Sequence, residues 1–455
     1  MSLFGIFSFT GTGHLHPLMA LGRELVRRGH EVVVFQVADV EPLVCAAGLE
    51  FHRIGDRKFP LGSLRPLDRT LGRLQGTQAL AFIFERFRQN SAIVLREGPV
   101  AVRSESIDVL IVDQAELAGG SVAERVGLPF VTAICTLPLN LDANVPFFSF
   151  NAGFDTGRRA MIQNALRNSW IRFLSSRLCE LVNQQRKAWG LPLNSGLDGF
   201  GSPLAQVAQL PKCFDFPHRK LPTSFHYTGP FLDRGGRREI AFPWERLDAS
   251  RPLVFLWMGT LQNGIERIFR IMAEACAALP VQTVISLGGG LPVEAIGSLP
   301  GDPIVVRYAP QLELLRKAAL TVFHGGLNTA LESLSCGVPM IAIPVTMDQP
   351  GVAARIMWTD TGKTIPVTQL TIERLRFAIE EVLTNPGYRA KAQRFQRLIA
   401  ANHGVARAAE LIEGARIGHS YPCIPELADS LMPNQFRFVS RRKRFITRPS
   451  CDSSL

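Results

Sequence analysis

Short apolar runs alternate with amphipathic stretches along the first half of the chain. The runs at 3–9 and 31–35 are rich in Phe, Ile and Val, as buried β-strands are. Between them, apolar residues recur at helical spacing over 18–28, and basic residues followed by a glycine supply the signals of a helix C-terminus. The pattern predicts a strand–helix–strand unit, from which parallel sheets are built.

The same rhythm continues to about residue 413. In the first half it predicts further strands at 108–113 and 128–134, with a helix between them. In the second half it predicts strands at 253–257, 281–287, 303–308, 320–324 and 340–344. The expected helices there are 264–279, 327–336, 352–358 and a helical stretch over 371–413.

The segment 226–252 separates the two halves. It is rich in Gly, Pro and charged residues, which favours a linker. We therefore expect a first domain at 1–225, a second at 253–417 and a basic C-terminal tail at 418–455. The predicted class is α/β, with two doubly wound, Rossmann-like domains facing each other across a cleft. Such sheets bind ligands at the carboxyl ends of their strands.

Composition narrows the function classes. The chain has 455 residues, more than one core usually holds, and 46% of them are hydrophobic. It contains no run of 18 apolar residues, so no membrane span is expected. The N-terminus fits a first strand better than a signal peptide, and eight scattered cysteines fit a reduced cytoplasm. The formal net charge of +11 suits an anionic partner, but no nucleic-acid motif is present, so we expect no nucleic acid.

The stretch 308–349 is the richest in candidate chemistry. Within it, HGGLNT places His324 at a strand end, then two glycines, then a helix beginning near Asn328. The free amides and the positive dipole end of a helix start favour a phosphate. Simpler explanations exist for each residue: Thr329 and Glu332 have capping-box spacing, and His324 alone fits a core histidine.

This block resembles the donor-binding signature of the family 1, UDP-dependent glycosyltransferases. Their pattern runs from aromatic-x-Pro-Gln through His-Cys-Gly-Trp-Asn-Ser and a Glu to Gly-Val-Pro and a final Asp-Gln. The likeness extends to about residue 415, and GTLQNG, VRYAPQLELL and DQPGVAARI look most like the bacterial zeaxanthin glucosyltransferases. The resemblance implies the GT-B fold and a hexosyltransferase that uses a UDP-sugar.

The resemblance also implies a set of donor-binding residues. Tyr308 would stack on the uracil, Gln311 would lie beside the ribose, and Glu332 would bind both ribose hydroxyls. His324, Asn328 and Thr329 would hold the diphosphate. The full set matched in this sequence is Thr260, Tyr308, Gln311, His324, Gly326, Asn328, Thr329, Glu332, Asp348 and Gln349, of which the last two would bind sugar hydroxyls.

Four positions depart from the family pattern. Gly325 and Leu327 replace the Cys and Trp of the signature. Met347 stands where a polar residue or Trp is frequent, and Trp257 where many members have Ser. These departures put the identity of the sugar and one side of the phosphate site in doubt.

The first glycine turn, GTGHLHP at 11–17, carries two histidines. The third glycine of a dinucleotide fingerprint is replaced here by His16, which weakens a nicotinamide oxidoreductase as an alternative. The family's own Gly-His-x-x-Pro fits instead and makes His14 the general base that deprotonates the acceptor. Asp113, at the end of the strand 108–113, would hold the ring. His16 is expected to cap, to pack or to line the acceptor entrance.

No Asp-x-Asp triplet occurs in the chain, so no metal and no cofactor are expected. The helix start and His324 would stabilise the leaving diphosphate instead. One backside displacement would invert the anomeric centre. A sugar-nucleotide epimerase or a non-catalytic lipid-binding homologue remain remote alternatives, and the second of these is disfavoured because both His14 and Asp113 are present.

The acceptor is expected to be lipophilic. Phenylalanines number 29, and those in 82–87 and 145–154 either line an acceptor groove or pack the core. The likeness within the family favours a carotenoid such as zeaxanthin, with glucose as the sugar, while macrolides and sterols stay open. We expect a cytoplasmic protein. Either it touches the inner face of the membrane, through the basic cluster 441–444 or through 158–174, or the tail is disordered and the helix at 158–174 merely covers the first domain.

Overall fold

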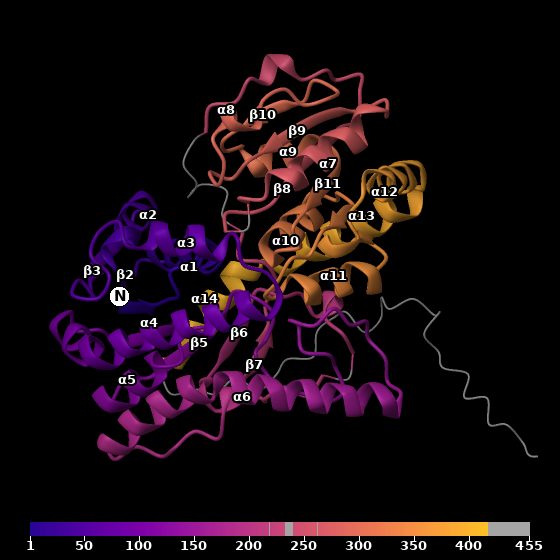
Figure 1. The fold of residues 1–455 in the computed structure, drawn as a ribbon. Coiled ribbons are helices and arrows are strands. Elements are labelled where there is room, and N and C mark those ends of the chain that lie inside the picture. Colours follow the sequence, from indigo (N-terminus) through magenta and orange to yellow (C-terminus); the bar gives the residue numbers. More distant parts are fainter. Residues whose placement is uncertain (218, 233–239, 262, 417–455) are drawn as a thin grey trace, which may run out of the picture. The chain divides into compact units, whose positions relative to one another are not determined.

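The computed structural model describes residues 1–217, 219–232, 240–261 and 263–416 (Figure 1). All of them belong to one unit of tertiary structure. Two parallel sheets form its framework, as the alternating pattern predicts.

The first sheet has seven parallel strands in the order β3-β2-β1-β4-β5-β6-β7. Their bounds are β1 Leu3–Phe7, β2 Glu31–Gln36, β3 Glu50–Arg53, β4 Val109–Asp113, β5 Phe130–Ile134, β6 Gln206–Ala208 and β7 Phe225–Tyr227. β1 pairs with β2 on one side and with β4 on the other. The strand order therefore reverses between β1 and β4, and this switch point is where doubly wound sheets place their ligands.

The second sheet repeats this plan with six strands in the order β10-β9-β8-β11-β12-β13. Their bounds are β8 Leu253–Trp257, β9 Gln282–Ser286, β10 Ile304–Val306, β11 Ala318–Phe323, β12 Met340–Ala342 and β13 Gly362–Thr364. Its switch point lies between β8 and β11, whose last residues Trp257 and Phe323 are paired. The short strands β3, β6, β7 and β13 were not expected from the sequence because, unlike the similarly short β10 and β12, they do not lie in a clear apolar run.

Helices connect the strands. In the first half they are α1 Thr12–Arg27, α2 Glu41–Ala46, α3 Leu64–Leu71, α4 Gly76–Ser104, α5 Gly119–Val126 and α6 Arg158–Ala188. In the second half they are α7 Glu266–Ala277, α8 Val293–Ile296, α9 Gln311–Lys317, α10 Leu327–Ser335, α11 Gln349–Trp358, α12 Ile372–Thr384, α13 Pro386–Asn402 and α14 Gly404–Ala415. Short 3₁₀ turns lie at Ala38–Val40, Leu197–Phe200, Lys212–Phe214, Trp244–Arg246 and Val367–Gln369.

α1 begins six residues before the start that its apolar spacing predicts. Pro17 lies inside the helix and is buried, so it does not break it. A proline has no N–H to donate to the carbonyl four residues back, which here is Gly13. The early start places His14 in the first turn of the helix rather than in the loop before it.

The last helix returns to the first sheet. α14 packs against α1 and also meets β5 and β6. Glu413 of α14 accepts from Arg28 at 3.1 Å and lies 3.1 Å from His30. The sequence pattern does not predict this return. The predicted linker 226–252 likewise overlaps β7 at its first two residues.

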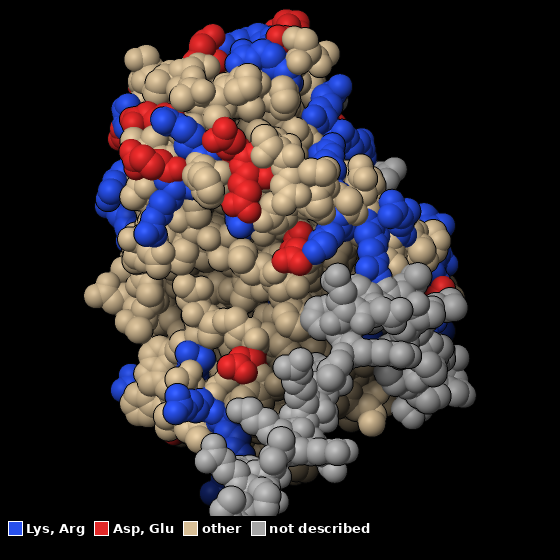
Figure 2. Space-filling model, turned by 90° about the vertical axis from the view of Figure 1, so that its right-hand side faces the viewer, with Lys and Arg blue, Asp and Glu red and all other residues tan. Residues whose placement is uncertain are grey.

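Charge is unevenly spread over the surface. Figure 2 shows one face on which basic and acidic side chains crowd the upper part, above a broad band of uncharged residues. The predicted basic tail at 418–455 lies outside the described residues, so the structure does not place its charges.

Candidate active site

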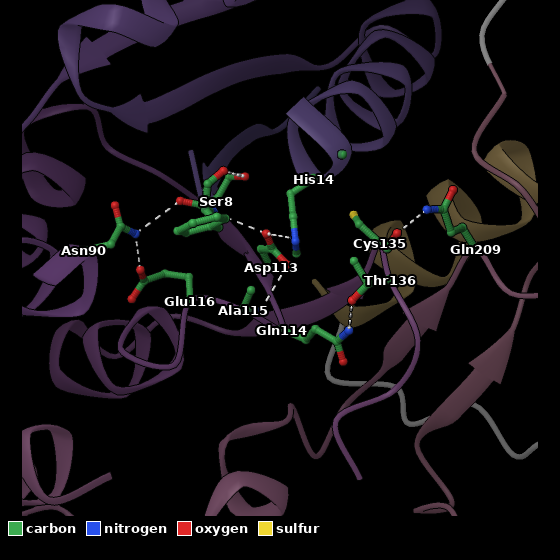
Figure 3. A network of polar contacts seen from close by, with 12 residues as sticks. Ser8, His14, Asn90, Asp113, Gln114, Ala115, Glu116, Cys135, Thr136 and Gln209 are labelled. Atoms are coloured by element: carbon green, nitrogen blue, oxygen red, sulfur yellow. Dashed lines mark hydrogen bonds and ion pairs between the residues drawn. The ribbon is translucent and has the colours of Figure 1, made fainter. Parts of the chain in front are cut away.

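A histidine and an aspartate meet at the first switch point, as the sequence predicts. His14 comes from the first turn of α1, and Asp113 is the last residue of β4. The His14 Nδ1 atom lies 2.8 Å from Asp113 Oδ2 (Figure 3). The carboxylate is fully buried and also accepts from the backbone N–H groups of Phe9 at 3.2 Å and Ala115 at 3.1 Å. These backbone donors hold the carboxylate in place, and the carboxylate in turn orients the ring.

The electrostatics suit a general base. Burial acts to lower the pKa of His14, but the charge of Asp113, with a smaller contribution from Asp348, outweighs it and the pKa is raised above its usual value. With Nδ1 facing Asp113 Oδ2 at 2.8 Å, the tautomer that carries its proton on Nδ1 leaves Nε2 as the acceptor of a proton. An imidazole held in this way can deprotonate a hydroxyl and then carry the proton as an imidazolium that Asp113 stabilises.

A second polar layer lies behind the dyad and was missed from the sequence. The Glu116 carboxylate accepts from Ser91 Oγ at 2.9 Å, from the Ala118 N–H at 3.1 Å and from Asn90 Nδ2. Asn90 also donates to the carbonyl of Ser8, in the turn after β1 (Figure 3). Burial raises the pKa of Glu116 to about 7, and the Asp113 charge adds to this rise. These hydrogen bonds connect α4 to the turns that follow β1 and β4, next to the dyad.

Histidine 324 lies at the second switch point in a cradle of glycines. A methyl group added at Gly259 would lie 2.7 Å from the His324 ring, and one at Gly326 would lie 2.5 Å from it. Burial lowers the pKa of His324 to about 4, so the ring is neutral near pH 7. It can therefore serve a diphosphate as a hydrogen-bond donor.

The turn that carries His14 contacts both the turn after β8 and the start of α10. Thr12 Oγ1 and Thr260 Oγ1 are 2.6 Å apart. Asn328 Nδ2 donates to the Gly13 carbonyl at 2.8 Å, which is the carbonyl that Pro17 leaves without its helical partner. The turn that carries His14 is thus joined to the start of α10, where the donor residues were predicted.

The residues predicted to bind the ribose lie together along α9 and α10. Gln311 Nε2 donates to Glu332 Oε2 at 2.6 Å and lies 3.4 Å from Thr329 Oγ1. α10 has Gly326 as its N-cap, with no side-chain capping bond, so the capping-box explanation of Thr329 and Glu332 does not hold. Tyr308 is 47% exposed, which leaves its ring available for stacking.

Asp348 and Gln349 begin α11. Burial raises the pKa of Asp348 to about 6, while the charge of His14 acts against the rise. The two groups are therefore within electrostatic reach of each other. Gln349 Oε1 accepts from the backbone N–H groups of Val345 at 2.8 Å and Thr346 at 3.1 Å, so one function of this side chain is to shape the turn before the helix. Met347, which the family pattern does not predict, adopts a left-handed backbone with φ of 59°.

A buried ion cluster anchors α11 to the first half of the chain. Arg355 of α11 donates from Nε to Asp215 Oδ1 at 3.1 Å, and both side chains are fully buried. Arg219 Nε lies 3.3 Å from Asp215 Oδ2, and Tyr227 donates to the same oxygen at 2.8 Å. The Arg355 guanidinium also lies over the Phe216 ring. Sequence reasoning missed this cluster because its members are far apart in the chain.

Three of the seven predicted groove phenylalanines are buried core residues. Phe84, Phe147 and Phe148 are buried, and the last two stack on each other. Phe87 is less buried and meets Phe9, whose ring in turn touches His14 edge-on. Phe87 is thus linked to the dyad through Phe9.

Comparison with known proteins identifies the family. The family model "UDP-glucoronosyl and UDP-glucosyl transferase" matches residues 92–402. The zeaxanthin glucosyltransferase of Pantoea ananas is 30% identical over 91% of this chain and 96% of its own. That of Pseudescherichia vulneris is 31% identical over 92% and 99%. The 4'-demethylrebeccamycin synthase of Lentzea aerocolonigenes is 25% identical over 89% and 97%.

Solved structures agree on the fold. The glycotransferase of kitacinnamycin superposes with a TM-score of 0.72 at 22% identity, covering 91% of this chain and 98% of its own. The glycosyltransferase VinC, solved in complex with DTDP, superposes with a TM-score of 0.66 at 21% identity, covering 92% and 100%. Two Rossmann-like sheets of this kind make the GT-B fold, and with the family model they show that the chain belongs to the UDP-glucoronosyl and UDP-glucosyl transferase family, as a glycosyltransferase.

Proposed function

We propose that this glycosyltransferase moves glucose from UDP-glucose to a hydroxyl group of a lipophilic acceptor, with inversion at the anomeric carbon. The observation that carries the proposal is the His14–Asp113 pair in a turn that contacts two predicted donor-binding residues, Thr260 through Thr12 and Asn328 through Gly13. A base and a leaving-group site on adjoining turns are what a single displacement needs.

The proposed step needs only groups of this chain and its two substrates. His14 Nε2 takes the proton of the acceptor hydroxyl while the oxygen forms a bond to the anomeric carbon. The bond from that carbon to the diphosphate breaks, and the electron pair leaves with UDP. The helix start at Leu327 and the neutral ring of His324 stabilise the departing charge by hydrogen bonding. Asp113 stabilises the imidazolium until the proton is released.

The acceptor proposal is a carotenoid alcohol such as zeaxanthin. Its support is that two relatives at about 30% identity are named zeaxanthin glucosyltransferases. The proposal includes a cytoplasmic protein, supported by the scattered, single positions of the eight cysteines in the sequence. It also includes contact with the inner face of a membrane, where such an acceptor is held. No helix of the described part is long and apolar enough to cross a bilayer.

The test is product analysis. The protein is incubated with UDP-glucose and a panel of alcohols that includes zeaxanthin, a sterol and a macrolide, and the products are identified by mass spectrometry and by the anomeric coupling constant. A β-linked hexose on zeaxanthin supports the whole proposal. Retention of the α-configuration contradicts the mechanism. Transfer only to the macrolide or the sterol contradicts the acceptor and leaves the mechanism intact.

The donor prediction concerns Glu332. If this carboxylate accepts from both ribose hydroxyls, UDP-glucose should have a kcat/KM about 5- to 150-fold higher than dTDP-glucose, which lacks one of them. Glu332→Gln should narrow this ratio of kcat/KM values while the melting temperature changes little. Equal kcat/KM for the two donors in the unmodified protein would contradict the assignment.

The metal prediction is that EDTA leaves activity largely unchanged. Among the described residues, no three His, Cys, Asp or Glu side chains are grouped as metal ligands, and the sequence has no Asp-x-Asp triplet. Initial rates are measured with UDP-glucose in chelator and again after added Mg²⁺. A complete loss that Mg²⁺ restores would overturn the metal-free mechanism.

A further inference from the structure

The helix α6 exposes large apolar side chains although its inward face is only partly apolar. That inward face, which packs on α4, buries Asn164, Asn168 and Ser175 together with Ile171, Leu178 and Val182. Its outward face exposes large apolar side chains: Ile162 is 62% exposed, and two more follow it toward the C-terminus. Surface helices normally place polar residues outward and apolar residues inward. The departure indicates that the outward face is made for an apolar environment.

The exposed apolar residues form one stripe. Ile162, Leu166 and Phe173 are 62%, 67% and 74% exposed, and their spacing of four and seven residues puts them on one side of the helix. We call these three residues the α6 stripe. The helix runs along the lower edge of the molecule in the view of Figure 1, and α4 is the helix that it packs against. The stripe is thus on the side of α6 away from the protein.

Basic residues flank the stripe. Residues 158–179 contain five arginines and no Asp or Glu. Arg158, Arg159, Arg172 and Arg177 are exposed. Arg158 and Arg159 occupy the first two positions of the helix, where the positive end of the dipole disfavours cations. Local helix stability does not account for their placement, whereas a negatively charged partner does.

We infer that the α6 stripe and its flanking arginines dock this protein on an anionic lipid bilayer, with Ile162, Leu166 and Phe173 inserted at the interface and the arginines on lipid phosphates. Apolar side chains beside cations on one helical face are the composition of interfacial helices. Each cation near an anionic surface strengthens attachment about fivefold, equivalent to about 1 kcal/mol. The inference rests on the surface of α6 and not on the identity of the acceptor.

Two other occupants fit the charge less well. A second copy of the chain would bring the same arginine-rich face against this one, and like charges would repel. The segment 417–455 carries six basic residues against three acidic ones, so it offers no excess negative charge either. A bilayer with acidic headgroups supplies both the apolar interior and the negative charge.

The test is co-sedimentation of the full chain with vesicles, without donor or acceptor. The unmodified protein should bind vesicles of phosphatidylcholine with 30% phosphatidylglycerol, should bind pure phosphatidylcholine far less, and should dissociate in 1 M salt, where the Debye length is about 3 Å. Failure to bind the acidic vesicles at low salt would overturn the inference. Since no substrate is present, this outcome is independent of whether the protein glycosylates anything.

Matched variants locate the surface. Ile162→Ser, Leu166→Ser and Phe173→Ser together should weaken binding at least tenfold, and Arg158→Gln with Arg159→Gln about 25-fold. Phe377→Ser removes an apolar side chain of α12 that is 67% exposed, and should leave binding unchanged. Because all these side chains are exposed, melting temperatures should stay within about 2 °C. Full binding by the triple Ser variant would place the contact elsewhere and overturn the inference. If the unmodified protein forms dimers and the triple Ser variant is monomeric, the stripe binds a second copy of the chain and the inference is overturned.

Discussion

His14→Ala is expected to lower kcat by roughly 10²- to 10⁴-fold, with the affinity for UDP changed by less than about twofold. The loss follows from the geometry, because His14 is the ring that Asp113 orients at 2.8 Å in a turn touching the donor turn. Nucleotide binding should survive, because the base is expected to act on the acceptor. Steady-state kinetics with UDP-glucose, together with calorimetric titration of UDP, separate the two effects.

His16 is the matched control for this prediction. It lies on the same helix two residues on, and it is exposed. His16→Ala should lower kcat by less than about tenfold. If His16→Ala proved the more damaging change, the assignment of the base would be wrong.

The pH profile tests the role of Asp113. His14 must be neutral to act, so kcat/KM should rise with pH through the pKa of His14, which the Asp113 charge holds above its usual value. Asp113→Asn removes that charge, so the acid limb of the profile should move to lower pH while the plateau falls. A plateau that falls with no movement of the limb would show that Asp113 does not set the pKa of His14.

Asp215→Asn is expected to destabilise the protein by about 3–5 kcal/mol. The change leaves Arg355 and Arg219 buried side by side with no anion between them. Arg355→Met should have a smaller effect, because Arg219 still neutralises Asp215. Unfolding in urea, followed by circular dichroism, should give this order. A larger loss in Arg355→Met would show that the arginine contributes mainly through packing on Phe216.

The same carboxylate predicts acid lability. Burial acts to raise the pKa of Asp215, but Arg355 and Arg219 together outweigh it, and the pKa is lowered. A carboxyl whose folded pKa is lowered contributes stability above its unfolded pKa of about 3.9 and loses that contribution as the pH falls through the folded pKa. The difference in stability between the unmodified protein and Asp215→Asn should therefore be constant near pH 7 and shrink below about pH 4.

The sequence predicts the fold class and the proximity of His14 and Asp113, but not the residues that support this pair. His14 and Asp113 could be paired in advance because each follows a buried apolar run, and neighbouring parallel strands end at the same edge of a sheet. Glu116 and Asn90 had no such signal, since their roles depend on α4 crossing behind that edge. One hint was available: Glu116 follows the same strand as Asp113 by three residues, in an otherwise apolar segment.

Other differences arise where tertiary contacts override local rules. The apolar spacing predicts a helix start at 18, but the helix begins at Thr12 and contains Pro17, because Asn328 satisfies the carbonyl that the proline leaves free. The periodicity of α6 does not mark its inward face, because apolar residues lie both on the buried side, such as Ile171 and Leu178, and on the exposed side, such as Leu166. β6 and β7 are three residues each and owe their existence to the sheet edge that they extend.

The return of α14 has a consequence for biosynthesis. α14 buries Ala408, Leu411 and Ile412 in the same core as α1. α1 is synthesised near the start of translation, and α14 is synthesised near the end. At about 5–20 residues per second, on the order of 20–80 seconds pass before the covering helix emerges. During that time the nascent first sheet keeps an apolar face open to water and to chaperones. The N-terminal half of this enzyme is therefore translated first but completed last.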